Sequence, residues 1–167
     1  MSITTENLRR EIVALLPRLR RFGRSVTRHR EDADDLVQLA VERALMRSEQ
    51  WQAGTRLDSW LFRIMQNAWI DELRSRHRHD QTFLPEEAAE HVGSSPTLAQ
   101  DDAMAIEQAM KQLSEEQRVV VSLVLVEGLS YKEAAQVLGI PIGTLTSRLA
   151  RARDALQSLL GGPEEKR

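Results

Sequence analysis

The side chains best suited to chemistry in this 167-residue chain are hydroxyls and guanidiniums near its C-terminal end. Apolar residues recur there at helical spacing, so the opposite face of that helix is polar. The polar face carries hydroxyls first and arginines one and two turns later, an order that suits insertion into the major groove of DNA. The alternative is a solvated face on which an arginine pairs with Asp154. The apolar residues are Leu145, Leu149, Ala152 and Leu156, and the polar ones are Thr144, Ser147, Arg148 and Arg151.

A turn motif precedes this helix. Ser130 and Glu133 fit a capping box, in which each side chain satisfies a backbone amide of the other residue. Ala135 is small where two helices would cross closely, and Gly139 stands where the turn needs a positive φ. Pro141 fixes the approach to the second helix. Together these residues predict a helix-turn-helix that binds DNA.

A second polar face is expected on a long helix in the first half of the chain. Its members are spaced by four, four, three and four residues, so they align opposite an apolar stripe. A row of arginines suits a phosphate backbone, and Asn67 could bond a base. Arg76, His77 and His79 would add positive charge. Trp51, upstream in a polar loop, either stacks on an unpaired base or covers the small core. The row is Arg63, Asn67, Asp71, Arg74 and Arg78.

An acidic run at 31–35 leads into Leu36, Val37 and Gln38. Carboxylates stabilise a helix N-terminus through its dipole, and this is a sufficient structural reason for a few of them. The run is longer than capping requires and would repel DNA, so a protein partner is the other interpretation. The residues by themselves leave both interpretations open.

The chain lacks the patterns of an enzyme or a metal centre. His77 and His79 are two residues apart, which puts them on different helix faces and argues against joint metal ligation. We find no phosphate-binding glycine loop, nucleophile elbow or catalytic triad. The absence of cysteine excludes disulfides and thiolate metal sites. We therefore expect no enzymatic activity, no metal, no cofactor and no small-molecule substrate.

Helical periodicity predicts the elements that hold these faces. An apolar series runs over the first 26 residues, and Pro17 within it is expected to open a second helix. The next helix should begin near Asp32. Asp58 or Ser59 should cap a third, long helix with a wide apolar stripe. That stripe is Trp60, Leu61, Ile64, Met65, Ala68, Trp69 and Leu73.

The second half of the chain shows the same periodicity from Met104 onward. Ser114 and Gln117 form a second capping box, which opens a helix through Val126 that Gly128 ends. Aromatic residues are only 4 % of the chain, while leucine, alanine, valine, glutamate and arginine are plentiful. Composition and periodicity together predict an all-α protein.

The formal net charge of −2 is distributed unevenly. Residues 1–79 carry +4 and residues 108–167 carry +1, whereas 80–107 carry seven acids and no Lys or Arg. Prolines, glycine and serines break the helical pattern within that acidic stretch, which favours a flexible linker. A short helix near 86–90 is left open. We predict two small helical domains, 1–79 and 104–160, joined by a flexible acidic linker over 80–103 and followed by a tail over 161–167.

The sequence also lacks membrane and export signals. No apolar run approaches the ~20 residues needed to span a bilayer. The first residues have neither the charged start nor the apolar core of a secretion signal. We therefore expect a cytoplasmic protein without membrane insertion.

Together these motifs resemble the extracytoplasmic-function (ECF) sigma factors, minimal two-domain members of the sigma-70 family. The resemblance covers nearly the whole chain and depends on the ordered set of motifs, because a helix-turn-helix by itself is weakly specific. The lack of a third helical domain between the halves fits this minimal group. The segments that carry the resemblance are 34–38, 59–67, 113–118, 128–135 and 141–153.

The resemblance implies three interfaces. The acidic segment would dock on the clamp helices of the β′ subunit of core RNA polymerase, and the linker would thread toward the active-site and RNA-exit channels of the polymerase. The β subunit is a further implied partner. The long helix and its upstream loop would capture the minus-ten element as it melts, and the last helix would read the minus-thirty-five element as duplex. The implied polymerase-binding residues are Asp34, Asp35, Leu36 and Gln38. The minus-ten residues are Trp51, Arg63, Asn67, Asp71, Arg74 and Arg78, and the minus-thirty-five residues are Thr144, Thr146, Ser147, Arg148 and Arg151.

Two positions depart from the family pattern. Leu39 follows Gln38 where such factors usually carry an acid, and Thr146 stands where a basic residue is common. The expected function is an alternative sigma factor for promoter recognition in a stress response, restrained by an anti-sigma protein. The alternatives are a sigma-like helix-turn-helix regulator acting without polymerase, and a decoy that occupies an anti-sigma protein without touching DNA.

Overall fold

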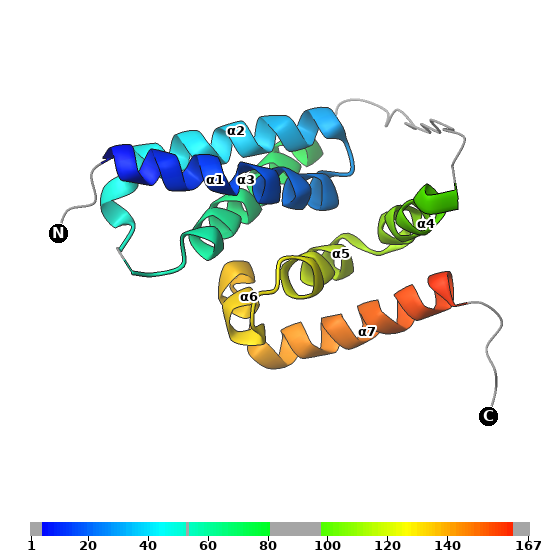
Figure 1. Cartoon of the computed structure of the whole chain (residues 1–167). Helices are drawn as coiled ribbons and strands as arrows, with labels where there is room; N and C mark the ends of the chain where they lie inside the picture. Colours follow the sequence, from blue (N-terminus) through cyan, green and yellow to red (C-terminus); the bar gives the residue numbers. More distant parts are fainter. Residues whose placement is uncertain (1–4, 53, 81–97, 162–167) are drawn as a thin grey trace.

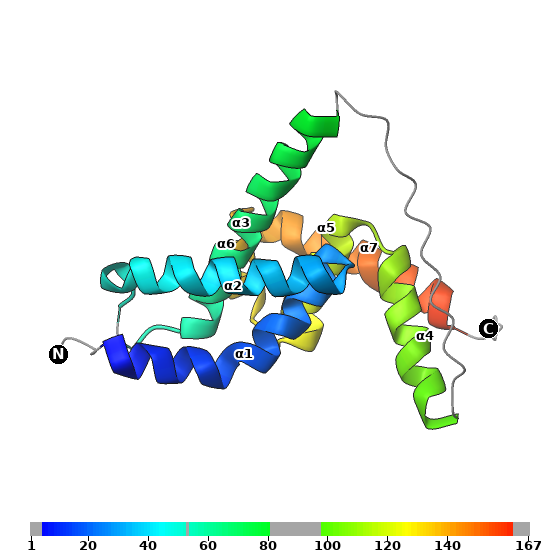
Figure 2. The same ribbon diagram turned by 90° about the horizontal axis from the view of Figure 1, so that it is seen from above.

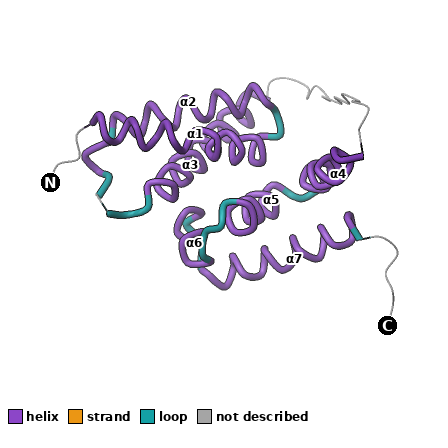
Figure 3. The backbone as a smooth tube through the Cα atoms, in the orientation of Figure 1, coloured by secondary structure: helices purple, strands orange, loops and turns teal. Residues whose placement is uncertain are grey.

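The computed structural model describes residues 5–52, 54–80 and 98–161, and every regular element within these residues is a helix. Figures 1 and 3 show an N-terminal domain of α1–α3 and a C-terminal domain of α4–α7, with short loops between successive helices inside each. The prediction of an all-α protein with two helical domains is confirmed. The elements are α1 (Thr5–Thr27), α2 (Arg30–Met46), the 3₁₀-helix η1 (Ser48–Gln50), α3 (Leu57–Asp80), α4 (Leu98–Gln112), α5 (Glu115–Val121), the π-helix η2 (Ser122–Val126), α6 (Tyr131–Leu138) and α7 (Ile142–Leu160).

The N-terminal domain is built on the close approach of α1 and α2, which run antiparallel, with α3 packed against both (Figure 1). A Cβ on Gly23 would lie 3.3 Å from the carbonyl oxygen of Ala33, so the missing side chain lets the two helices meet. Phe22 and Phe62 are fully buried with ring centroids 4.9 Å apart. Phe62 extends the apolar stripe that the sequence predicted for α3.

A single helix α1 runs through Pro17, so the prediction that Pro17 opens a second helix is wrong. Proline has no N–H to bond the carbonyl four residues earlier, and α1 bends in its middle (Figure 2). Pro17 is exposed, and the buried residues Ile12 and Leu19 on either side keep both segments on the core. Tertiary packing therefore overrides the local helix-breaking tendency.

The other helix boundaries differ from the prediction by small amounts. Helix α2 begins at Arg30, and α3 begins at Leu57 with Asp58 inside its first turn. Asp58 still accepts a hydrogen bond from the Ser59 amide at 2.8 Å. Helix α4 begins at Leu98, within the stretch that the sequence assigned to the linker. The short helix considered near 86–90 lies outside the described residues.

Both predicted capping boxes are confirmed in the C-terminal domain. The Gln117 amide donates to Ser114 Oγ at 3.2 Å, and the Glu133 amide donates to Ser130 Oγ at 3.1 Å. Gly139 has the positive φ, +65°, that the turn between α6 and α7 was expected to need. Leu145 and Leu149 are buried, as predicted for the inner face of α7.

The helix that follows the first capping box departs from the expected α-helix. It changes after Val121 into the π-helix η2, whose wider turn is closed by the Glu127 amide donating to the Ser122 carbonyl at 2.9 Å. The extra residue rotates the end of the helix. As a result Val126 is 45 % exposed, whereas the Glu127 side chain is fully buried.

The two domains pack against each other. Helix α1 contacts α5 and η2, and α3 contacts α6. Figure 1 shows α5 and α6 beneath the α1–α3 layer. The sequence left open whether the domains would touch, and we call this arrangement the closed packing.

Candidate nucleic-acid and protein interfaces

The predicted DNA face of α7 is largely exposed. Thr146, Ser147 and Arg151 are exposed and Thr144 is half-buried. Thr146 Oγ1 donates to the Ile142 carbonyl at 2.9 Å, and Ser147 Oγ donates to the Gly143 carbonyl at 3.0 Å. Because their protons are used within the helix, both hydroxyls offer lone pairs outward. They are therefore suited to accept from the amino groups of adenine or cytosine in the major groove.

Arg148 differs from its neighbours on α7, because it lies at the edge between the domains. Its guanidinium is 3.5 Å from the Glu116 carboxylate on α5, and its side chain is 28 % exposed. It lines a cavity together with Gln66 and Leu73 of α3. The acid partner of Arg148 is thus Glu116, and no arginine pairs with Asp154 among the described residues, in contrast to the alternative interpretation of the sequence.

The predicted polar row of α3 is exposed along its whole length. Arg63, Asn67, Arg74 and Arg78 reach solvent, and Asp71 lies 3.8 Å from Arg43 of α2. Among the described residues, none of the row's three arginines has an ion-pair partner. The row is therefore a positively charged surface with an amide near its centre.

Arg76 has a structural role that corrects one expectation. It donates to Asp32 of α2 at 2.6 Å and to Glu72 at 3.0 Å, and its guanidinium lies 5.3 Å from the ring centroid of Trp69. The hydrogen bond from Arg76 lowers the pKa of the Asp32 carboxyl, with burial opposing the shift. The charge of Arg76 is neutralised there, so it fastens α3 to α2 and does not add to the positive surface.

Trp51 packs at the edge of the N-terminal core. Its ring is half-buried, and its indole N–H is buried without an acceptor among the described residues. The sequence left open whether Trp51 stacks on an unpaired base or covers the small core, and in the structure it covers the core. Trp69 is buried and Trp60 half-buried, as expected for the apolar stripe.

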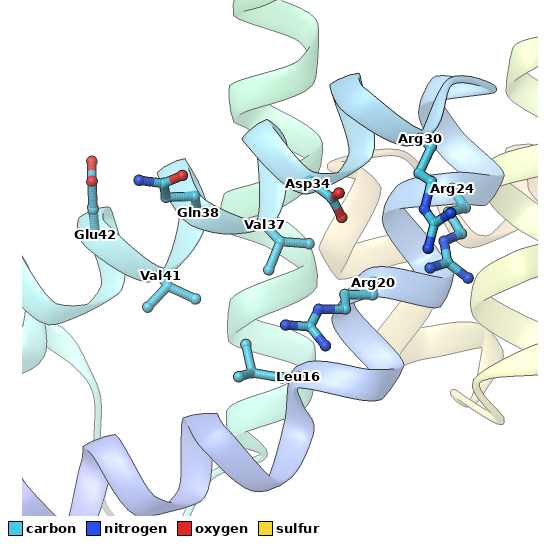
Figure 4. Close-up of a pocket in the computed structure, with 9 residues that line it drawn as sticks. All are labelled: Leu16, Arg20, Arg24, Arg30, Asp34, Val37, Gln38, Val41 and Glu42. Carbon is cyan, nitrogen blue, oxygen red and sulfur yellow. The ribbon is translucent and has the colours of Figure 1, made fainter.

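A groove of about 490 Å³ lies between α1 and α2, and we call it the α1–α2 groove (Figure 4). Leu16, Val37 and Val41 form its apolar part, while Arg20 and Asp34 stand on facing walls. Further polar lining comes from Arg24, Arg30, Gln38 and Glu42, of which Gln38 and Glu42 point away from α1 (Figure 4).

Two predicted polymerase-binding residues do not line the α1–α2 groove. Asp35 is exposed on α2 beside it. Leu36 is only 5 % exposed and packs into the domain core, so its side chain is not part of the surface. This corrects the expectation for Leu36, which belongs to the apolar periodicity of α2.

The domain interface contains a charge network that the sequence did not reveal. Glu127, whose side chain is fully buried, accepts from Arg18 Nε at 2.9 Å and from Arg21 Nε at 2.8 Å. Arg18 also donates to Asp58 at 3.0 Å, which links α1, α3 and the C-terminal domain. Burial raises the pKa of the Asp58 carboxyl, but hydrogen bonds from Arg56, the Ser59 amide and Arg18 outweigh it and leave the pKa lowered. We call Arg18, Arg21, Arg56, Asp58, Glu127 and Glu133 the interdomain charge network; its outer pair is Arg56 with Glu133.

Arg118 of α5 makes a second polar connection to α1. Its buried guanidinium donates to the carbonyls of Ser25 and, at 3.3 Å, Val26 at the C-terminal end of that helix. A cation is favourable there because the helix dipole places negative charge at that end. Burial, with repulsion from Arg28, lowers the pKa of Arg118 to about 10, so the group stays charged at neutral pH. A further connection joins α3 to α5, where the indole N–H of Trp69 donates to the Glu115 carboxylate at 2.9 Å.

The part of the chain that the structure describes contains neither a candidate metal site nor a candidate membrane-spanning helix. No three His, Asp or Glu side chains are grouped there as a metal ion would need. None of the described helices is long and apolar enough to cross a bilayer.

Comparisons with known proteins match both halves of the chain. Residues 103–156 match the family described as Sigma-70, region 4, and residues 12–66 match the Sigma2 domain of PhyR. The ECF RNA polymerase sigma factor EcfG of Rhodopseudomonas palustris is 35 % identical over 156 residues, which are 93 % of this chain and 86 % of that protein. The ECF sigma factor SigM of Mycobacterium tuberculosis is 37 % identical over 143 residues, 86 % of this chain and 71 % of the relative.

Solved structures show the same arrangement of helices. The sigma factor RpoE from Bartonella quintana, solved in complex with the anti-sigma factor NepR, superposes with a TM-score of 0.81 at 33 % identity. The match covers 95 % of this chain and 99 % of that one. CnrH, solved with the cytosolic domain of CnrY, matches with a TM-score of 0.66 at 24 % identity, over 94 % of this chain and 89 % of the other. The likeness to CnrH shows a shared fold alone.

Proposed function

Because this chain belongs to the ECF sigma factors, we propose that it binds core RNA polymerase, directs it to specific promoters and helps to open the minus-ten region. The observation that carries the proposal is the presence, in one chain and in family order, of two helical domains that each expose a polar helix face. The α3 face and the α7 face serve different DNA elements. The acidic surface of α2 serves the polymerase.

In this proposal the α7 face reads the minus-thirty-five element as duplex. Arg151 is exposed and makes no ion pair with a described residue, so it can reach a guanine edge or a phosphate. Thr144, Thr146 and Ser147 lie nearer the start of the helix and add acceptors. Arg148 would join them by leaving Glu116. Their ion pair is weak because the Glu116 side chain is 68 % exposed.

The α3 face takes the minus-ten element. Arg63, Arg74 and Arg78 would track phosphates, and the Asn67 amide would bond an unpaired base. Flipping a base out of its stack costs a few kcal/mol, which a polar pocket and an aromatic surface can offset. Trp51 supplies that aromatic surface only if its loop moves, because its ring packs on the core in the closed packing.

The α1–α2 groove is the proposed docking site for the polymerase clamp. Asp34 and Gln38 line it, with Asp35 beside it. A partner with arginines and apolar side chains would meet acids above an apolar floor of Leu16, Val37 and Val41. The described residues that line this groove all belong to α1 and α2, so the C-terminal domain forms none of its walls in the closed packing (Figure 4).

Promoter recognition requires the domains to separate in this proposal. In the closed packing, α6 lies against α3 and the polar edge of α7 faces Gln66 and Leu73 of α3. Two elements that lie apart on one promoter cannot both be reached by faces held together. An anti-sigma protein that favours the closed packing would therefore restrain the factor, and the NepR complex of the Bartonella relative supports this class of partner.

Run-off transcription with purified core RNA polymerase and a panel of promoter fragments tests the proposal. We expect transcripts from a subset of fragments, with discrete start points that appear only when this chain is added. Circular dichroism establishes in parallel that the chain is folded. A folded chain that neither binds core polymerase nor yields any specific transcript contradicts the proposal.

A further inference from the structure

The first residue of α7 is an aliphatic side chain that the fold does not use. Ile142 is 53 % exposed, whereas Ile140, two residues earlier, packs against the hydrophobic core. Figure 1 shows this end of α7 next to α6, on the side of the C-terminal domain away from the α1–α3 layer. Ile142 is therefore exposed at the end of the helix that approaches base edges in a helix-turn-helix.

Thr146 stands one turn after Ile142 on the same edge of α7, because residues four positions apart are neighbours on a helix. The Thr146 hydroxyl donates to the Ile142 carbonyl at 2.9 Å. This hydrogen bond restricts the rotamer of the exposed threonine, so the position of its γ-methyl group is restricted as well. Ile142 and the γ-methyl group of Thr146 thus lie together on one edge of the helix, which we call the α7 apolar edge.

The α7 apolar edge lies on the far side of the polar face from α3. Arg148 lines the cavity beside α3, and neither Ile142 nor Thr146 does. By the period of the helix, Ser147 and Arg151 lie between Arg148 and the apolar edge. A duplex that meets the centre of the polar face would therefore also reach the apolar edge.

Gly143 keeps the surface beside this edge free. A Cβ at this position would meet no atom within 4 Å, and Gly143 does not have a positive φ. Glycine stabilises a helix less than alanine does, so neither the backbone conformation nor the packing of the protein accounts for it. The missing side chain leaves room for a ligand to come close to Ile142.

The ligand group that fits an apolar edge in the major groove is a methyl group. Among the DNA bases, only thymine presents one there, at C5, and the methyl group of threonine is among the protein groups that contact it. Aliphatic side chains gain from this contact because it removes apolar surface from water. A phosphate would require a cation, and neither Ile142 nor Thr146 carries a charge.

We propose that the α7 apolar edge recognises the C5-methyl group of a thymine, with Ile142 as the residue that determines this specificity. The inference rests on the proposed function, in which α7 enters the duplex of the minus-thirty-five element. The Thr146 hydroxyl can accept from the amino group of adenine beside that methyl group. The edge therefore favours an A·T pair over a G·C pair at the position it meets.

The direct test removes the methyl group alone. Deoxyuridine replaces each thymine of the upstream element in turn, which deletes the C5-methyl group and keeps the base pair. Binding of the full chain with core RNA polymerase is followed by fluorescence anisotropy, on a promoter fragment that yields a run-off transcript. At one thymine the substitution should weaken binding about fourfold, the loss expected for one buried methyl group.

A double-mutant cycle assigns this effect to a residue. Ile142→Ala should weaken binding to the thymine fragment about fivefold, and deoxyuridine should then cost less than about 1.5-fold. Thr146→Ser deletes the γ-methyl group, keeps the hydroxyl and should reduce the deoxyuridine effect by about half. Ile142→Val, which keeps an aliphatic side chain, should retain most of it.

Leu159→Ala is the matched control, because Leu159 is an aliphatic side chain of α7 that is 41 % exposed near the other end of the helix. It should change the affinity by less than about 1.5-fold. The inference is overturned if no thymine responds to deoxyuridine, or if Ile142→Ala leaves the response undiminished. Equal weakening by Leu159→Ala and Ile142→Ala would overturn it too.

A second measurement adds the methyl group to a different base. At the thymine that responds, a G·C pair containing 5-methylcytosine should bind the unmutated chain at least about twofold more tightly than one containing cytosine. Ile142→Ala should bind the two fragments equally. Equal binding of both fragments by the unmutated chain would contradict methyl recognition.

Failure of this inference is distinguishable from failure of the proposed function. A chain that directs transcription equally well from thymine and deoxyuridine promoters refutes the inference and leaves the proposed function standing. If no fragment yields a transcript, the full chain alone selects duplexes from a random pool at low salt, and the best binder receives the same substitutions. Methyl-dependent binding there supports the inference against the proposed function, whereas binding without methyl dependence, or no selected duplex, overturns the inference as well.

Discussion

The domain interface and the two exposed helix faces use the same residue type in opposite ways. At the interface, Arg18 and Arg21 share the buried carboxylate of Glu127. On the faces, Arg63 and Arg151 have no acid partner among the described residues. An arginine that neutralises a buried acid cannot be withdrawn without leaving that charge uncompensated, whereas an unpaired arginine is available to a phosphate or a base. The presence of a partner therefore separates the arginines that hold the interface from those that remain available to a ligand.

Arg148 falls between the two groups, because it belongs to the predicted DNA face of α7 and also contacts an acid at the edge of the domain interface. Its partner Glu116 is 3.5 Å away and mostly exposed, so the contact can be exchanged for DNA at little cost. Glu127 cannot be exchanged in this way. Opening of the domains should therefore be opposed chiefly at Glu127, and DNA contact should be governed by residues farther out on the helices.

The largest predicted effect comes from breaking the buried pair. Glu127→Gln leaves Arg21 without a counter-charge and Arg18 with Asp58 alone, and we expect a loss of about 2–3 kcal/mol of domain-packing free energy after allowing for the partial exposure of Arg21. Urea unfolding followed by circular dichroism, together with energy transfer between dyes on Glu49→Cys and Gln157→Cys, one exposed position in each domain, measures it. Glu133→Gln, on the exposed side of the same network, is the control and should lose less than half as much. Equal losses would mean that burial does not set the contribution of these pairs.

The next effect concerns an unpaired arginine. Arg151→Ala should weaken use of the upstream promoter element by about 1–3 kcal/mol if the guanidinium reads a base, without changing the midpoint of thermal unfolding. Arg153→Ala is the matched change, since Arg153 is exposed on α7 but lies outside the predicted DNA-binding residues. Run-off transcription on promoters with single upstream substitutions measures both. Uniform weakening on all sequences would assign Arg151 to a phosphate.

A smaller effect is expected on α3. Asn67→Ala should slow promoter opening by about tenfold while duplex contacts through α7 persist, because the amide acts on a base only after unpairing. Permanganate footprinting of unpaired thymines follows the opening. A template with a pre-opened minus-ten bubble should restore most of the rate, and Ser75→Ala, exposed on the same helix, should have no effect. If the bubble template does not help, Asn67 acts elsewhere than in opening.

The smallest effect is electrostatic and depends on pH. Arg76 lowers the pKa of the folded-state Asp32 carboxyl, so this pair stabilises the fold above the unfolded pKa of about 4 and its contribution is lost as pH falls through the folded value. Because both side chains are partly exposed, we expect less than about 1 kcal/mol. Denaturant titrations between neutral and acid pH should show that the free energy of unfolding falls less steeply with pH in Asp32→Asn than in the unmutated chain. An unchanged slope would mean that the pair contributes nothing.

The sequence predicted the local elements well because they depend on nearby residues. Capping boxes at Ser114 and Ser130, the positive φ of Gly139 and the apolar face of α7 are properties of short segments. Pro17 misled the prediction because the gain from burying both halves of α1 exceeds the local cost of one missing hydrogen bond. Such a balance is decided by tertiary contacts that no local pattern contains.

The interface was invisible to the sequence for a related reason. Arg18 and Glu127 are 109 residues apart, and nothing in either segment specifies the other. The one local sign was an acid directly after the apolar run of η2, and it became meaningful only when the π-turn rotated Glu127 inward. The exposed rows on α3 and α7 were predictable because surface periodicity is itself local. Leu36 was wrongly assigned to the polymerase-binding surface because the whole segment 34–38 was treated as exposed. The helical period of α2 places the Leu36 side chain in the core.

The central claim is that the closed packing must open for this sigma factor to act. The most direct test follows energy transfer between dyes at Glu49→Cys and Gln157→Cys during initiation on a promoter that yields a run-off transcript. We expect high energy transfer in the free chain and a loss of transfer when core polymerase and promoter DNA are both present. Productive transcription with transfer unchanged from the free chain would contradict it.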